Sequence, residues 1–277
     1  MKRLISIQDI SCLGKCSQTI ALPIISAMGI ETTIIPTAVL STHTMFPGFT
    51  FTDLSSDMPD IVAHWKSLDI HFDAILTGYL GTVNHIHMIH DFYDNFADEN
   101  TLTIVDPVFA DNGKMYPIFN KEYADAVTTL CSKARYIVPN ITEAAIMAGM
   151  PYKDNYDQSY INEILDRLSQ KGASNIIITS IRRDNENGIV ARFSDGSDFE
   201  YFKPHIDSQF HGTGDLFAST FAGALLNGFA VSDAVTIAVD YTSHTLLKTL
   251  ENKSHSWYGV DFETTIPWLL KRLGKID

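Results

Sequence analysis

The stretch LISIQDISCLGKCSQTIALPIISAMGIETTII, residues 4–35, decides the fold that this sequence predicts. Residues 4–7 form a short apolar run typical of a buried strand, residues 18–28 have a helical pattern, and residues 32–35 repeat the strand pattern. Gly29 stands between the helix and the second strand, where a glycine commonly ends a helix. This order of elements predicts two parallel strands joined by a crossover helix.

Further apolar runs continue the alternation of strands and helices. They occupy residues 74–77, 102–105, 136–138 and 176–179. Short runs of this kind are typical of parallel strands that are covered on both faces. The sequence therefore predicts an α/β fold with a single domain over residues 1–277, arranged as a three-layer α/β/α sandwich with a mostly parallel central sheet. In such sheets, ligands bind beyond the carboxyl ends of the strands.

Residues 188–202 depart from this alternation. Two strand-like runs, residues 188–193 and 199–202, flank Ser194-Asp195-Gly196-Ser197, and an Asp-Gly pair between such runs predicts a hairpin. We expect this hairpin to form an antiparallel edge of the sheet. Helices are expected from Gly212 onward, over residues 231–250, and over residues 262–273.

Composition and charge exclude several classes of partner. The chain has 20 Lys and Arg against 33 Asp and Glu, a formal net charge of −13, which repels nucleic acid and anionic membranes. An anionic ligand must therefore be held by a local site. The amino-terminal residues lack the apolar core of a signal peptide, and no apolar run approaches the length of a membrane span, so we expect a cytoplasmic protein. Cys12, Cys16 and Cys131 are expected to be reduced thiols.

The segment Gly212-Thr213-Gly214-Asp215 precedes a helix-like apolar run, residues 216–223. Glycines at a helix N-terminus allow backbone N–H groups to surround an anion, and a carboxylate behind them can take a proton from a hydroxyl group. This is the outline of a phosphoryl-transfer site. Taken alone, the segment fits equally well a glycine turn whose Asp215 stabilises the helix dipole.

Two other segments supply carboxylates after predicted strands. Asn140-Ile141-Thr142-Glu143 has the spacing of a capping box, which would explain both polar residues without any function. Glu143 could also face a hydrated Mg²⁺, because that ion prefers oxygen ligands and retains water molecules. The two interpretations are compatible. Asp106, followed by Pro107, offers a further carboxylate, although Asp-Pro is common in ordinary turns.

Gly14-Lys15-Cys16-Ser17 lies between a strand and a helix, as a P-loop does. The P-loop pattern requires glycine where Asp9 stands and serine or threonine where Cys16 stands, so we reject this motif.

Polar and aromatic residues after other strands could form a ring-binding pocket. Ser41, His43 and Thr44 could orient a small heterocycle, and the Tyr79 ring, next to Gly78, could stack on a flat substrate. Either segment could equally be plain turn structure. Another group, His85, His87 and His90, does not share one helical face, so we expect a solvated surface there rather than a metal site.

Several of these motifs follow one another in the order seen in ribokinase-like vitamin kinases, and the chain most resembles the pyridoxal/pyridoxamine kinases of that superfamily over nearly its whole length. Gly-Thr-Gly-Asp and Asn-x-x-Glu mark the superfamily, whereas the Ser-x-His-Thr and Thr-Gly-Tyr-Leu-Gly segments point to the B6-vitamer branch. The segments that carry the resemblance are Gln8-Asp9, Leu40–Thr44, Leu76–Gly81, Asp106–Val108, Asn140–Glu143, Ile178–Ser180 and Gly212–Asp215.

The resemblance implies an ATP-dependent kinase that phosphorylates the 5′-hydroxymethyl group of a B6 vitamer to the 5′-phosphate. Asp215 would be the base, and the amides of Gly212, Thr213 and Gly214 would hold the transferred phosphoryl group. The resemblance also implies that Asp106 and Glu143 act on Mg²⁺. It implies that the nucleotide is bound by Asp106, Asn140, Thr179, Ser180 and Thr213. The vitamer would be bound by Asp9, Ser41, His43, Thr44 and Tyr79. The resemblance also implies a homodimer, and it leaves a requirement for K⁺ open.

One departure from the family pattern bears on specificity. Many members carry serine directly after the first-strand glutamine, whereas this chain has Asp9. A carboxylate can pair with an amine more strongly than a neutral hydroxyl can, so we hypothesise that Asp9 favours pyridoxamine. Two alternatives to a B6-vitamer kinase remain: a hydroxymethylpyrimidine kinase of thiamine synthesis, and a non-catalytic vitamer-binding protein on the same scaffold.

Overall fold

The computed structural model describes residues 1–208 and 210–277. Its strands are β1 (Arg3–Leu13), β2 (Glu31–Thr42), β3 (Phe51–Asp53), β4 (Ala74–Thr77), β5 (Leu102–Val105), β6 (Ala110–Asp111), β7 (Lys114–Met115), β8 (Tyr136–Ile137), β9 (Ile176–Arg183), β10 (Glu186–Arg192) and β11 (Asp198–Pro204). Its helices are α1 (Gln18–Ala27), α2 (Met58–Ser67), α3 (Val83–Phe96), α4 (Lys121–Lys133), α5 (Ile141–Met147), α6 (Gln158–Gln170), α7 (Thr213–Leu226), α8 (Val231–Glu251), η1 (Phe262–Thr264) and α9 (Ile266–Arg272).

One nine-stranded sheet runs through the molecule in the order β11-β10-β9-β8-β5-β4-β1-β2-β3. The pairs from β2 to β9 across the centre are parallel. The predicted hairpin is confirmed, because β10 and β11 pair antiparallel and β11 ends the sheet. The α/β fold with a mostly parallel sheet is thus the observed architecture.

The first two strands are longer than the sequence pattern predicts. Asp9 lies within β1, next to a register shift between Gln8 and Ile10, and Ser41 and Thr42 belong to β2 rather than to a loop after it. The sequence pattern also misses β3, which pairs antiparallel with β2 and forms the second edge of the sheet. These extensions contain polar residues, so they lack the continuous apolar run that identifies a buried strand.

A bulge interrupts β9 at the residues predicted to touch the nucleotide. Ile178 pairs with Val190 and Ile181 with Gly188, so Thr179 and Ser180 together oppose one residue of β10. Ser180 adopts a φ of 60°. Thr179 and Ser180 therefore lie inside β9, whereas the apolar run at residues 176–179 predicted that the strand ends there. Bulges of this kind are common next to ligand sites.

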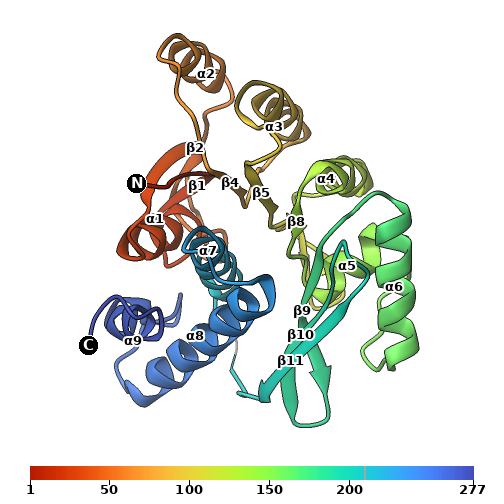
Figure 1. The fold of residues 1–277 in the computed structure, drawn as a ribbon. Coiled ribbons are helices and arrows are strands. Elements are labelled where there is room, and N and C mark those ends of the chain that lie inside the picture. Colours follow the sequence, from red (N-terminus) through yellow and green to blue (C-terminus); the bar gives the residue numbers. More distant parts are fainter. Residues whose placement is uncertain (209) are drawn as a thin grey trace.

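Helices cover both faces of the sheet (Figure 1). On one face, α1, α7, α8 and α9 pack on Leu4, Leu76 and Ile104, and on the other face α2 to α6 pack on Ile5, Ile75 and Val105. Neighbouring residues of one strand thus belong to different cores, which explains why β4 and β5 are apolar except for Thr77 and Thr103. The three layers place the carboxyl ends of the parallel strands at one edge of the molecule.

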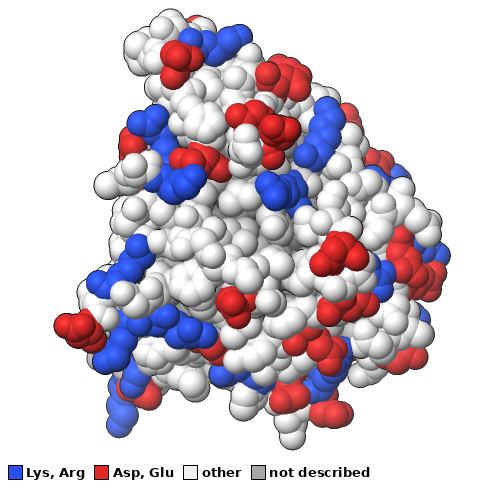
Figure 2. Space-filling model, in the orientation of Figure 1, with Lys and Arg blue, Asp and Glu red and all other residues white. Residues whose placement is uncertain are grey.

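The charged side chains do not form a single patch on the face drawn in Figure 2, where acidic and basic residues are interspersed. Among the residues that the structure describes, no helix has the length and apolar character needed to span a membrane.

Candidate active site

The N-terminus of α7 begins at Gly212, whose backbone can be formed only by glycine. Its φ is 81°, and a Cβ atom there would lie 2.0 Å from the carbonyl oxygen of Lys15. The first hydrogen bond at this helix end runs from the Leu216 N–H to the Gly212 carbonyl, so the N–H groups of Thr213, Gly214 and Asp215 precede it. Such first-turn N–H groups are free to bind an anion.

Asp215 lies on the first turn of α7, partly buried. Burial raises the pKa of Asp215 to about 7; the backbone amide of Ser17 lowers it in part, and the negative charge of Asp9 raises it further. A carboxyl group with a pKa near neutrality can exchange a proton with a substrate at physiological pH.

Asp106 and Glu143 lie in the same acidic region as Asp215. Burial, followed by the charges of Glu143 and Asp215, raises the pKa of Asp106 well above its usual range. Burial also raises the pKa of Glu143 to about 7, although three backbone amides oppose that shift. A Cβ atom on Gly214 would stand 3.7 Å from Asp106 Oδ2, so this carboxylate faces the turn that begins α7.

The capping box predicted at the start of α5 is present. Asn140 Oδ1 accepts hydrogen bonds from the amides of Thr142 and Glu143 at 2.9 and 3.0 Å, and Glu143 Oε2 accepts from the Asn140 amide at 2.9 Å. Glu143 Oε1 also accepts from the amides of Phe109 and Ala110 at 2.8 and 3.3 Å. Asn140 and Glu143 therefore fasten the segment that follows Asp106 onto α5.

These oxygen donors fit a hydrated magnesium ion. Asp106 offers a carboxylate whose ionised form is destabilised by its neighbours, a cost that a divalent cation would relieve. Glu143 is only 2% exposed and already accepts three amide hydrogen bonds, which suits contact through water better than direct coordination. Within residues 1–208 and 210–277, no group of three His, Cys, Asp or Glu is arranged to hold a metal ion directly.

Asp9 and Tyr79 come together beside Asp215. Asp9 is 3% exposed, accepts a hydrogen bond from Ser11 Oγ at 2.8 Å, and has a pKa raised by burial. Its negative charge, after burial, raises the pKa of Tyr79. Gly78 allows this approach, because a Cβ atom there would lie 2.2 Å from Gln8 Oε1. The two strand-end segments chosen from the sequence thus meet in space.

His43 is buried in an aromatic cluster that joins distant parts of the chain. Its ring centroid lies 4.9 Å from that of Phe46, 4.5 Å from His211 and 5.8 Å from Trp257. Burial, and then the proximity of His211, lowers the pKa of His43, so both rings are neutral near pH 7. His211 directly precedes Gly212, yet a single histidine beside a glycine motif gave no signal in the sequence.

The remaining predicted residues lie at the margins of this region. Thr44 is exposed, and Ser41 closes the following loop, since its hydroxyl accepts a hydrogen bond from the Thr50 amide at 2.9 Å. Thr179 is bridged to Asn140 and donates its amide to the Pro139 carbonyl at 2.9 Å, which sets it beside the α5 capping box. Ser180, next to it on the bulge, is exposed.

The expectation of a solvated histidine surface on α3 is wrong for His85. This side chain is fully buried, its Nδ1 contacts the Leu80 carbonyl, and its Nε2 lies 2.8 Å from Ser55 Oγ. Only His87 of the three is exposed. His85 faces the core because the loop that carries Tyr79 folds back over α3, a tertiary contact that helical spacing alone does not reveal.

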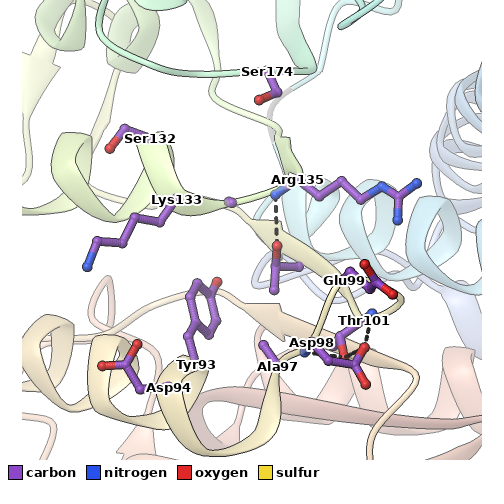
Figure 3. Close-up of a pocket in the computed structure, with 12 residues that line it drawn as sticks. Tyr93, Asp94, Ala97, Asp98, Glu99, Thr101, Ser132, Lys133, Arg135 and Ser174 are labelled. Atoms are coloured by element: carbon purple, nitrogen blue, oxygen red, sulfur yellow. Dashed lines mark hydrogen bonds between the residues drawn. The ribbon is translucent and has the colours of Figure 1, made fainter.

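A hollow of about 610 Å³ lies at the opposite edge of the sheet (Figure 3). Thr101, Arg135 and Ser174 line it, and these residues precede β5, β8 and β9. The hollow is therefore at the amino ends of the parallel strands, away from the acidic cluster, and ligands of such sheets bind at the other end.

Known proteins share the sequence pattern and the fold of this chain. The family model for phosphomethylpyrimidine kinase matches residues 22–258, and the chain belongs to this family. It is similar to the pyridoxal kinase of Arabidopsis thaliana, with 27% identity over 276 residues, covering 92% of this chain and 85% of the relative.

Two solved structures share the fold closely. A Bacteroides thetaiotaomicron protein crystallised with pyridoxal is 34% identical, with a TM-score of 0.92 and coverage of 97% of this chain and 95% of that one. A pyridoxal kinase from Lactobacillus plantarum is 30% identical, with a TM-score of 0.90 and coverage of 98% and 97%. The predictions of a ribokinase-like fold and of a phosphotransferase are confirmed.

The hydrogen bonds of Glu143 predict a large structural cost on its removal. Glu143→Ala leaves the amides of Phe109, Ala110 and Asn140 without their acceptor, at roughly 1–3 kcal/mol for each group that stays buried and unsatisfied. We expect a lower free energy of unfolding in urea, and a smaller loss for Glu143→Gln, which retains one oxygen. The control is Glu122→Ala, exposed on α4. Equal losses for the Ala and Gln variants would contradict this account.

Proposed function

We propose that this protein is a B6-vitamer kinase, which transfers the γ-phosphoryl group of ATP to the 5′-hydroxymethyl group of pyridoxal, pyridoxamine or pyridoxine. The product would be the 5′-phosphate of vitamin B6 salvage. The observation that carries this proposal is Asp215, a carboxyl group with a pKa of about 7 on the first turn of α7, directly behind the Gly212 turn.

The reaction follows from the positions of these groups. Asp215 takes the proton of the hydroxymethyl group as its oxygen forms a bond to the γ-phosphorus and the bond to the β-phosphate oxygen breaks, releasing ADP. The N–H groups of Thr213 and Gly214 would hold the negative charge on the transferred group. Mg²⁺, held near Asp106 and through water by Glu143, would supply positive charge to the phosphates when bound.

The vitamer ring would lie between Asp9, Tyr79 and the loop that carries His43 and Thr44. Tyr79 supplies an aromatic surface, and neutral His43 can exchange hydrogen bonds with ring substituents without adding charge. On the nucleotide side we assign Asn140, Thr179 and Ser180. We also propose that the chain forms a single domain and, from the family resemblance, that the protein is a homodimer. Whether it requires K⁺ is left open.

Hydroxymethylpyrimidine kinase is the second candidate function. The matching family model carries the name of a phosphomethylpyrimidine kinase, and a pocket for one flat hydroxymethyl heterocycle can accept another. A non-catalytic binding protein is disfavoured, because binding alone does not call for a desolvated base next to an anion site.

The first test is an ADP-release assay on purified protein with Mg·ATP, in which pyridoxal, pyridoxamine, pyridoxine and hydroxymethylpyrimidine are compared side by side. We expect phosphorylation of B6 vitamers with higher kcat/KM than of the pyrimidine, with the product mass confirmed. Preference for the pyrimidine would assign the second candidate function. Vitamer binding without any turnover would support the binding protein instead.

Removal of the base tests the role of Asp215. Asp215→Ala and Asp215→Asn should lower kcat by about 10²- to 10⁴-fold with little change in vitamer affinity. In the wild type, kcat/KM should rise with pH through about 7, because the base acts in its deprotonated form. Asp233→Ala, an exposed acidic residue in the first turn of α8, is the control. Near-normal turnover of the Asp215 variants would remove this residue from the mechanism.

The ratio of kcat/KM for pyridoxamine over pyridoxal tests the hypothesis on Asp9. A hydrogen bond to a charged group contributes roughly 1.5–3 kcal/mol, so Asp9→Ser should lower this ratio by about 10- to 150-fold. Asp91→Ser, exposed on α3, should leave it unchanged. An unchanged ratio for Asp9→Ser would mean that Asp9 does not select the vitamer.

A further inference from the structure

The Gly14–Ser17 loop does not match the P-loop motif, but it contacts the proposed active site. It is held there by the ion pairs of the Lys15 side chain and by packing of its backbone on Gly212. Lys15 Nζ lies 2.9 Å from Asp261 Oδ1 and 3.0 Å from Glu263 Oε2, and the Lys15 and Asp261 side chains are only 16% and 13% exposed. Burial lowers the pKa of Lys15, but hydrogen bonds to the two carboxylates more than reverse this, so its pKa is raised and it remains charged. The ammonium group of Lys15 is thus paired with two protein carboxylates, whereas a P-loop lysine binds phosphate.

The partners of Lys15 are themselves fixed to the end of α8. Asp261 Oδ2 accepts a hydrogen bond from Asn252 Nδ2 at 2.7 Å, and the Asp261 amide donates to Thr249 Oγ1 at 2.8 Å. A Cβ atom on Gly259 would lie 2.4 Å from Lys15 Cβ, so the chain between α8 and η1 packs directly on the lysine stem. The ion pair therefore joins the Gly14–Ser17 loop to the segment between α8 and η1, which is itself hydrogen-bonded to the end of α8.

The backbone of the same loop touches the catalytic turn. The Lys15 carbonyl lies so close to Gly212 that no side chain fits there. Two residues further on, Ser17 is 6% exposed and adopts a φ of 50°, and its backbone amide lowers the pKa of Asp215. A positive φ at a non-glycine residue costs energy and persists only where the surroundings impose it.

We propose that Lys15 is a positioning residue for phosphoryl transfer: its ion pair with Asp261 and Glu263 clamps the Gly14–Ser17 loop under the N-terminus of α7 and so sets the Ser17 amide against Asp215. The inference rests on the proposed kinase function. In this proposal Lys15 acts through the backbone of its own loop, because its ammonium group is bound to Asp261 and Glu263. Misplacement of a catalytic group by about 1 Å can cost on the order of 10²-fold in rate.

The test compares Lys15→Met with the wild type in steady-state kinetics across pH. We expect kcat to fall by about 10- to 100-fold while KM for Mg·ATP and for the vitamer stays within about threefold. Loss of the Ser17 amide from the carboxylate raises the pKa of Asp215, so the rise of kcat/KM with pH should move to higher pH. Lys15→Arg, which keeps the charge, should restore both quantities.

Lys203→Met is the matched control, because Lys203 Nζ forms a comparable 2.9 Å ion pair with Asp240 between β11 and α8. It should lose stability in a thermal melt without a change in kcat or in the pH profile. Should Lys15→Met fail to fold, Glu263→Gln removes only the exposed partner, whose side chain is 53% exposed, and should lower kcat in the same direction by a smaller factor.

Three results would overturn the inference: a wild-type kcat and pH profile in Lys15→Met, the same loss of kcat in Lys203→Met, or a rise in KM for Mg·ATP with kcat unchanged, which would make Lys15 a nucleotide contact. A wild type without turnover on any acceptor would instead refute the proposed function. The two failures are therefore distinguishable.

Discussion

The constraint on which the rest of this structure depends is a group of three carboxyl groups at one edge of the sheet, of which Glu143 is buried and Asp106 and Asp215 are partly buried. Burial raises the pKa of Asp106, Glu143 and Asp215, and the charges of Glu143 and Asp215 act on Asp106 as well. Placing them together costs folding free energy above their unperturbed pKa values, because each would ionise more readily in the unfolded chain. In the proposed function, Mg²⁺ bound beside Asp106 and Glu143 would offset this cost.

Backbone amides, rather than basic side chains, stabilise the ionised form of two of these carboxyl groups. Glu143 is stabilised by three amides, and Asp215 by the amide of Ser17. Positive φ values at Ser17, Val108 and Ser180 occur in the loop before α1, just after Asp106, and at the bulge of β9. Strained backbone of this kind is commonly found at ligand sites, where the direction of a backbone or side-chain group must be fixed. Here it occurs in three segments next to the acidic residues.

Much of the fold could be predicted because its signals are local. The runs at residues 74–77 and 102–105 coincide with β4 and β5, since both faces of each strand are covered and only one residue of each, Thr77 and Thr103, is not apolar. The capping box of Asn140 and Glu143 is likewise complete within four residues. The pattern failed where strands carry polar residues, as in the second half of β1, and where a distant segment covers a side chain, as Leu80 and Ser55 cover His85.

The sequence by itself determined the alternation of the central strands and helices, the glycine turn before α7 and the identity of the acidic residues, because each of these signals lies in neighbouring positions of the chain. Only the tertiary structure decided which of them meet. Tyr79 and Asp9 come together because β1 and β4 are parallel neighbours, and His43 and His211 because β2 ends near the start of α7. Lys15 reaches Asp261 across 246 positions of the chain, and no local pattern encodes a contact between residues so far apart.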